Sequence, residues 1–168
     1  MLSHLKYKRI MLKISGEALA GEAHRGLDFE VIHSVCDAIK SCTDLGVQVG
    51  LMVGAGNFWR GVKDGADKMQ RSHADAMGML GTVMNSIAVA DALSQHGIDA
   101  RVLCAVEMNK FCEYFTRDLA DRYLNEGKVV VIAGGTGNPY FSTDTGVVLR
   151  GVEIEADAIL MAKNVDGI

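Results

Sequence analysis

The sequence has little proline, few aromatic residues and no cluster of basic residues. One of its 168 residues is proline, 6% are aromatic, and the formal net charge at pH 7 is −4 with both signs scattered along the chain. Proteins that bind a nucleic-acid duplex gather lysine and arginine on one face. The longest basic run is the short segment KYKR at residues 6–9, so we expect no nucleic-acid partner.

Metal-binding and export signals are also missing. The four cysteines have neither CxxC pairing nor zinc-site spacing, so we expect four buried or half-buried thiols and no metal site built from protein ligands. The chain shows no secretory signal peptide and no continuous apolar run of about 18 residues. We therefore expect no membrane partner and a cytoplasmic location, where thiols stay reduced.

Common nucleotide-binding motifs are not found either. No GxxxxGK[ST] segment occurs, which excludes a P-loop protein. The segment GAGNFWRG contains GxG but lacks the third glycine of the dinucleotide fingerprint, which argues against a hydride-transfer enzyme. Neither a GxSxG elbow nor the catalytic loop of protein kinases is present.

Apolar runs and helical periodicities alternate along the chain. They predict strands at residues 9–15, 47–53, 100–106, 128–133 and 158–162, and helices at 27–45, 73–96, 116–127 and 143–155. Continuous apolar strands separated by helices are typical of a largely parallel sheet that is covered on both faces. We expect one α/β domain over residues 1–168 with three α/β/α layers.

The predicted helix at residues 73–96 is apolar nearly all round. Such a helix is buried, either in the core or against another subunit, and its methionines are expected to serve packing. Asp75 could cap its first turn, and Gly97 is expected to end it. We predict that this helix packs at a subunit interface.

Glycines and cations collect at the carboxyl ends of the predicted strands, where parallel α/β sheets bind ligands. Nineteen glycines are present, and the strand ends read KISGE, GAGN followed by Arg60, GGTGN and KNVDG. Backbone N–H groups of such tips, together with cations, bind phosphate. Lys13 lies within a buried strand, where its charge needs a partner, so we favour a functional role over a solvent-exposed one. Arg60 alone is equally compatible with an ordinary loop residue.

Taken together, these segments resemble the amino-acid kinase superfamily and, within it, the family of bacterial uridylate (UMP) kinases. The resemblance runs from Tyr7 to Ile168 through YKRIMLKISGEAL, GNFWRG, DAMGMLGTVMN, GGTGNPYFSTD and EADAILMAKNVDGI. TGNPYFSTD is the most specific segment, because it separates uridylate kinases from kinases that act on aspartate, glutamate, carbamate or acetylglutamate.

The resemblance implies transfer of the γ-phosphoryl group of ATP to UMP, giving UDP in pyrimidine nucleotide biosynthesis, with Mg²⁺ accompanying ATP. It implies that Lys13, Arg60 and Asp144 are catalytic, Asp144 by orienting the lysine. The implied ATP-binding residues are Lys13, Ile14, Ser15, Gly16, Gly56, Arg60 and Lys163. The implied UMP-binding residues are Ala55, Asp75, Thr136, Gly137, Asn138, Pro139, Tyr140, Phe141, Ser142 and Thr143.

The resemblance further implies a homohexamer, with GTP and UTP as candidate effectors. The sequence departs from the family in two places. The family usually has three glycines before Asn57, whereas Ala55 adds a methyl group near a phosphate. The family also continues beyond Ile168 with the segment that holds the adenine. We therefore expect the chain as written to bind UMP, to bind ATP poorly and to have negligible kinase activity.

Two other interpretations remain open at this point. One is a related kinase whose acceptor is an amino acid or carbamate. The other is a nucleotide-binding fragment that serves assembly or regulation without turnover.

Overall fold

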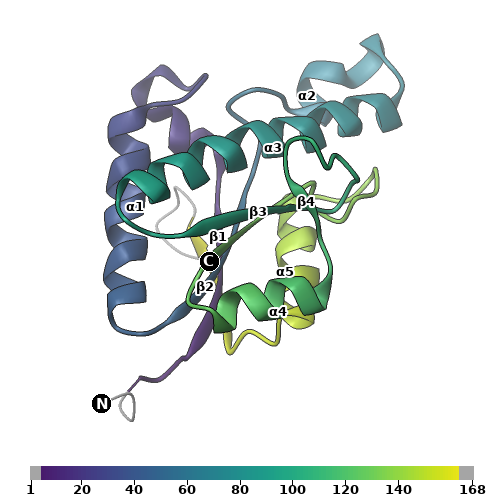
Figure 1. Ribbon diagram of the computed structural model, residues 1–168. Helices are drawn as coiled ribbons and strands as arrows, with labels where there is room; N and C mark the ends of the chain where they lie inside the picture. Colours follow the sequence, from purple (N-terminus) through teal and green to yellow (C-terminus); the bar gives the residue numbers. More distant parts are fainter. Residues whose placement is uncertain (1–4, 163–168) are drawn as a thin grey trace.

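A six-stranded parallel sheet forms the centre of the computed structural model, in which residues 5–162 are described (Figure 1). The strand order is β4-β3-β5-β2-β1-β6, and every pairing between neighbours is parallel. The predicted mainly parallel sheet is therefore confirmed. The strands are β1 Arg9–Ile14, β2 Gln48–Val53, β3 Ala100–Cys104, β4 Glu113–Tyr114, β5 Val129–Ala133 and β6 Ala158–Ala162.

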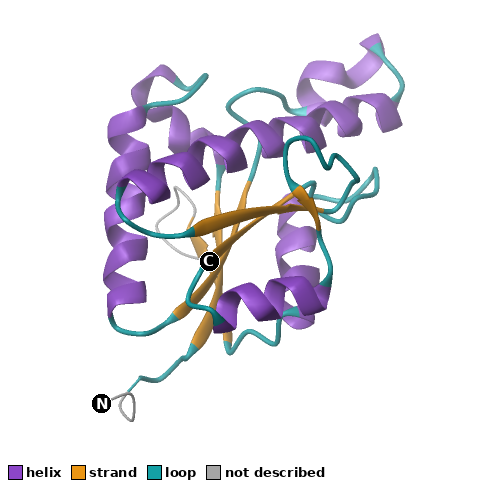
Figure 2. Cartoon of the chain, in the orientation of Figure 1, coloured by secondary structure: helices purple, strands orange, loops and turns teal. Residues whose placement is uncertain are grey.

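Helices cover both faces of this sheet, which confirms the predicted three layers (Figure 2). Helices α1 and α3 share one buried apolar cluster with the sheet, and α4 and α5 share a second cluster on the opposite face. The long helices are α1 Phe29–Asp44, α3 Arg71–Gln95, α4 Arg117–Asn125 and α5 Thr143–Glu153. The short ones are η1 Gly16–Ala23, α2 Gly61–Gly65 and η2 Ala66–Lys68.

Alternation along β1 decides on which face its lysine lies. Side chains of a strand point to opposite faces in turn. Ile10 and Ile14 belong to the cluster with α1 and α3, whereas Met11 belongs to the cluster with α4 and α5. Lys13 has the parity of Met11, so the strand presents this lysine to the layer that contains α5.

Helix ends follow the expected local signals in two cases and not in a third. Asp28 caps α1 by accepting the N–H groups of Glu30 at 3.0 Å and Val31 at 3.3 Å. Gly97, with a φ of 77°, follows the end of α3 in the left-handed conformation that glycine tolerates. The expectation that Asp75 caps α3 is wrong, because this helix begins at Arg71 and Asp75 lies within it.

The elements that the sequence pattern missed are short and carry no apolar periodicity. These are the two 3₁₀ helices η1 and η2, the five-residue helix α2 and the two-residue strand β4. The expected buried or half-buried thiols are confirmed, since Cys36, Cys104 and Cys112 are buried and Cys42 is half-buried. Burial raises the pKa of the Cys36 and Cys112 thiols to about 11, which disfavours their reactive thiolate forms.

Helix α3 runs across one face of the sheet and extends beyond it to α2 (Figure 1). Within residues 5–162 it is the one helix whose length and composition would suffice to cross a membrane, and half of that stretch is buried inside the molecule. The other half includes an exposed apolar stripe at helical spacing. Met77, Leu80, Met84 and Ile87 are between 40% and 54% exposed, so α3 is less buried than its composition predicts.

Candidate functional site

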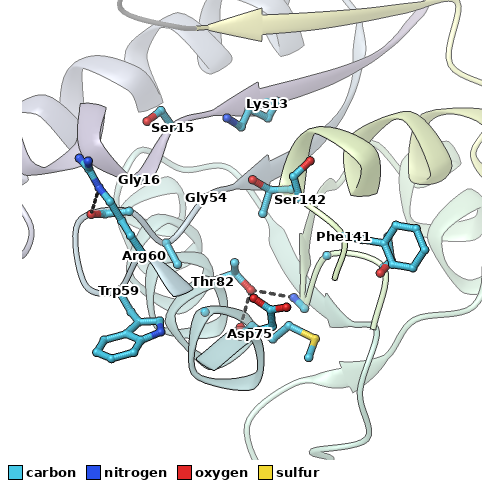
Figure 3. Close-up of a pocket in the computed structure, with 18 of the residues that line it drawn as sticks. Lys13, Ser15, Gly16, Gly54, Trp59, Arg60, Asp75, Thr82, Phe141 and Ser142 are labelled. Atoms are coloured by element: carbon cyan, nitrogen blue, oxygen red, sulfur yellow. Dashed lines mark hydrogen bonds between the residues drawn. The ribbon is translucent and has the colours of Figure 1, made fainter. Parts of the chain in front are cut away.

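A cavity of about 500 Å³ lies at the carboxyl ends of β1, β2 and β5, where the sequence predicted a phosphate site (Figure 3). Its wall includes residues from η1, α3 and the loops after β2 and β5. The structure brings twelve of the predicted site residues together as lining residues: Lys13, Ser15, Gly16, Ala55, Gly56, Arg60, Asp75, Thr136, Asn138, Phe141, Ser142 and Thr143.

The remaining predicted residues lie around this cavity or outside the described chain. Ile14 is buried in the apolar cluster with α1 and α3, and its carbonyl accepts the N–H group of Gly54 at 2.9 Å. Gly137, Pro139 and Tyr140 belong to the loop that borders the cavity but do not line it. Lys163 lies outside the described residues.

Lys13 has the partner that its burial demands. Its side chain is 9% exposed, and its Nζ lies 3.0 Å from Oδ1 of Asp144 in the first turn of α5. Ser142 caps α5, because its Oγ accepts the N–H group of Thr145 at 3.2 Å. Asp144 lies in the first turn of the same helix, and its carboxylate is directed at the lysine. The pair holds the lysine at the end of β1, where it faces the cavity.

Arg60 is held by a carboxylate that the sequence analysis did not assign to the site. Its Nη2 lies 2.6 Å from Oε1 of Glu17 in η1, and both side chains are partly exposed. The backbone N–H group of Arg60 also donates to Asp64 at 2.8 Å. Both cations of the cavity with predicted roles are thus paired with carboxylates.

The tips of β1 and β2 approach each other closely. A Cβ atom at Gly16 would lie 2.4 Å from the carbonyl oxygen of Gly54 and 2.6 Å from Oδ1 of Asn57, so only glycine fits there. The methyl group of Ala55 has a different neighbour. A Cβ at Gly81 of α3 would lie 2.9 Å from the Cβ of Ala55, which shows that this methyl group points to the helix. The extra methyl group of Ala55, whose effect on phosphate binding the sequence left open, is thus packed against α3.

The loop after β5, residues 134–142, is tied to α3 at its far end. The N–H group of Tyr140 donates to Oδ2 of Asp75 at 2.8 Å, and Arg71 makes a forked ion pair with the same carboxylate. Tyr140 has a φ of 73°, which is uncommon for a non-glycine residue. The guanidinium of Arg71 lies 5.6 Å from the ring centroid of Tyr140, so the loop conformation depends on the start of α3.

Four buried polar residues hold the glycine-rich tips and were missed by the sequence analysis. Thr82 Oγ1 accepts the N–H group of Gly134 at 2.8 Å. Asn85 and Arg150, each less than 10% exposed, donate to the carbonyls of Gly54 and Gly135, and Asn57, which belongs to the tip of β2, is bonded to Asn85. A signal for the residues on α3 was present, because positions 75, 82 and 85 share one face of a helix with 3.6 residues per turn.

The arrangement suits a ligand with phosphate groups. Lysine, arginine and glycine-rich backbone converge on one cavity, and these groups bind phosphate oxygens. Within residues 5–162 no group of three or more His, Cys, Asp or Glu residues could hold a metal ion.

Comparison with known proteins agrees with this fold and site. The model of the amino acid kinase family matches residues 8–168, and the chain belongs to this family. Within it, the chain is similar to bacterial UMP kinases of known structure. The chain is 35% identical to UMP kinase from Bacillus anthracis, with a TM-score of 0.91. This match covers 96% of this chain and 67% of that one. For UMP kinase from Ureaplasma parvum the identity is 33%, the TM-score 0.90 and the coverage 96% and 71%.

Proposed function

We propose that this protein is a UMP kinase, which transfers the γ-phosphoryl group of ATP to UMP and gives ADP and UDP. The observation that carries the proposal is a single cavity in which the Lys13–Asp144 pair faces the loop of residues 136–143. The similarity of the chain to two UMP kinases, over 96% of its length, supports UMP as the acceptor.

The chain supplies position and charge to this reaction. A transferring phosphoryl group passes through a loose transition state, and the negative charge on its oxygens must be held in line and stabilised. Lys13 and Arg60 are the cations placed for this task at the cavity. Mg²⁺ bound to ATP supplies further positive charge. The phosphate of UMP is already ionised, so no side chain needs to act as a general base.

The two sides of the cavity take different parts of the reaction. We assign the phosphates of ATP to the tip of β1 and to the side of β2 that carries Gly56 and Arg60. We assign UMP to Ala55, Asp75 and the loop of residues 136–143. Asp75 already accepts the N–H group of Tyr140, so the same carboxylate is placed to hold the loop and to accept a ribose hydroxyl.

Assembly as a homohexamer, effects of GTP and UTP, a cytoplasmic location and a role in pyrimidine nucleotide biosynthesis belong to the same proposal. The homohexamer, the effects of GTP and UTP and the pathway rest on the family resemblance alone. The exposed apolar stripe of α3 supports assembly in general, because a contiguous apolar surface of this kind marks an interaction site.

An acceptor panel tests the proposed reaction. Calorimetry measures binding of UMP, CMP, AMP, GMP, aspartate, glutamate and carbamate to the chain. A coupled assay of ADP release then measures turnover in this chain and in the protein extended to the length of its relatives. We expect UMP to bind and react far better than every other acceptor. Equal use of CMP and UMP would remove the claim of uracil selection, and turnover of an amino acid or carbamate would assign the protein to a related kinase.

A further inference from the structure

Two buried side chains hold the backbone of the cavity from outside it. Asn85 of α3 and Arg150 of α5 do not line the cavity, yet each donates hydrogen bonds to carbonyl oxygens of a glycine-rich tip. They approach from helices on opposite faces of the sheet. One binds the tip of β2 and the other the tip of β5.

Asn85 is fully buried, and its hydrogen bonds fix the orientation of its amide. Its Nδ2 donates to the carbonyl of Gly54 at 2.7 Å and to Oδ1 of Asn57 at 2.8 Å. Asn57 returns a hydrogen bond to Oδ1 of Asn85 at 3.0 Å and donates to the carbonyl of Gly26 at 2.7 Å. These four hydrogen bonds fix the orientation of both amide groups, so the carbonyl of Gly54 is held toward α3.

Arg150 acts on the second tip through a charged donor. Its side chain is 8% exposed, and its guanidinium makes three long hydrogen bonds of 3.3 to 3.4 Å to the carbonyls of Gly135 and Thr136. The guanidinium is itself fixed by Glu153 at 2.7 Å and by the ring of Phe115, whose centroid lies 4.4 Å away. These contacts hold the two carbonyls toward α5.

Holding a carbonyl on one side determines the direction of the next N–H group. In a planar trans peptide the C=O and N–H bonds are antiparallel, and no cis peptide occurs among residues 5–162. The N–H group of Ala55 therefore points away from Asn85, and that of Thr136 points away from Arg150. Both residues line the cavity. By contrast, the N–H groups of Gly54 and Gly134 are bonded inside the protein, to Ile14 and Thr82.

We propose that Asn85 and Arg150 are positioning residues that aim the N–H groups of Ala55 and Thr136 into the cavity as donors to phosphate oxygens. The proposal rests on the proposed function only for the identity of the nucleotide. The direction of the two N–H groups follows from peptide geometry, and the ligand class is a phosphate ester or an inorganic phosphate.

Amide NMR of the chain tests the direction of the two N–H groups without any variant. UMP and, separately, inorganic pyrophosphate are added, and the amide resonances of Ala55 and Thr136 are compared with those of Gly54 and Gly134. We expect the first pair to shift strongly and the second pair much less. Shifts of equal size in both pairs, or none at Ala55 and Thr136 while the ligand binds, would overturn the proposal. If pyrophosphate gives the expected pattern but UMP neither binds nor reacts, the proposed function fails and the present inference stands.

Variants test whether the two side chains act through these N–H groups. Asn85→Ala and Arg150→Met are each expected to weaken UMP binding about tenfold or more, because the freed peptide no longer has a fixed direction. Arg150→Lys keeps the charge and is expected to recover part of this loss. A folded variant of either residue that binds UMP as tightly as the parent chain, with the Ala55 or Thr136 shift intact, would refute the role.

A matched control separates positioning from stability. Asn125 is a surface amide that hydrogen-bonds Arg9, Gln48 and Asp121 near the amino ends of β1 and β2, at the end of the sheet away from the cavity. Asn125→Ala is expected to lower the melting temperature but to leave UMP affinity unchanged. If Asn85→Ala and Asn125→Ala reduced UMP affinity equally, Asn85 would be a structural residue only.

Discussion

Over residues 75–87 the two faces of helix α3 reverse the usual chemistry of a soluble helix, whereas Val89 and Leu93 farther along belong to the apolar cluster with α1. The face turned to the strand tips carries Asp75, Thr82 and Asn85, each hydrogen-bonded to a loop of the cavity. The opposite face exposes a stripe that includes Leu80 and Met84. An ordinary surface helix buries its apolar side and exposes its polar side.

This reversal shows that two separate demands shape the helix. Glycine-rich tips expose many backbone groups that must find partners, and the inner face of α3 supplies polar ones. The outer face leaves its apolar side chains between 40% and 54% exposed, so this apolar surface is available to another subunit. The composition of α3 is apolar when it is averaged over both faces. For this reason its sequence suggested a helix that is buried all round.

The largest effect is expected at a residue that belongs to neither face of α3. Lys13→Ala in the protein extended to the length of its relatives should lower kcat about 10² to 10³-fold and change KM for UMP little, because its charge stabilises the transition state. Arg60→Ala should instead weaken nucleotide binding generally. Steady-state kinetics with Lys40→Ala as the control, a surface lysine paired with Asp44, measures this. Near-normal kcat in Lys13→Ala would show that the cavity works without this lysine.

The outer face of α3 should affect assembly and leave the fold intact. Leu80→Glu combined with Met84→Glu should abolish an interface worth about 2 kcal/mol for each buried side chain. Sedimentation is expected to show oligomers for the parent chain at micromolar concentration and monomers for the double variant, with little change in the free energy of unfolding. Val152→Glu on α5, exposed at 70%, is the control that should stay oligomeric. A parent chain that is only monomeric would contradict the interface.

A smaller effect, on stability, is expected at the contact between Ala55 in the loop after β2 and Gly81 of α3. Gly81→Ala should destabilise the fold by about 1–3 kcal/mol, because its new Cβ meets the methyl group of Ala55. The exchange Ala55→Gly with Gly81→Ala should restore the melting temperature. Gly78→Ala, whose Cβ would meet nothing closer than Trp59 at 4.0 Å, should be neutral or stabilising by up to about 1 kcal/mol. If Gly81→Ala and Gly78→Ala changed the free energy of unfolding equally, the contact between Ala55 and Gly81 would be unimportant.

Periodicity predicted five of the six strands and the four long helices. The glycines and cations at the strand ends predicted where the cavity lies. Periodicity could not predict η1 or β4, because short segments at strand ends have no repeat to detect. Glu17 and Arg150 were missed for another reason: their roles depend on which distant backbone or side chain they meet. The sequence suggested that Lys13 needs a partner, and only the first turn of α5 shows how Asp144 reaches it.

The ion pairs of Lys13 with Asp144 and of Arg60 with Glu17 also set the electrostatic character of the cavity. Each cation already has an internal counter-ion, so the cavity attracts free anions less strongly than its lysine and arginine suggest. A nucleotide that binds shares these cations with their carboxylates rather than displacing free ions from them. Its affinity should therefore vary less with ionic strength than the number of cations implies, and anions are selected by the shape of their phosphate groups more than by their charge.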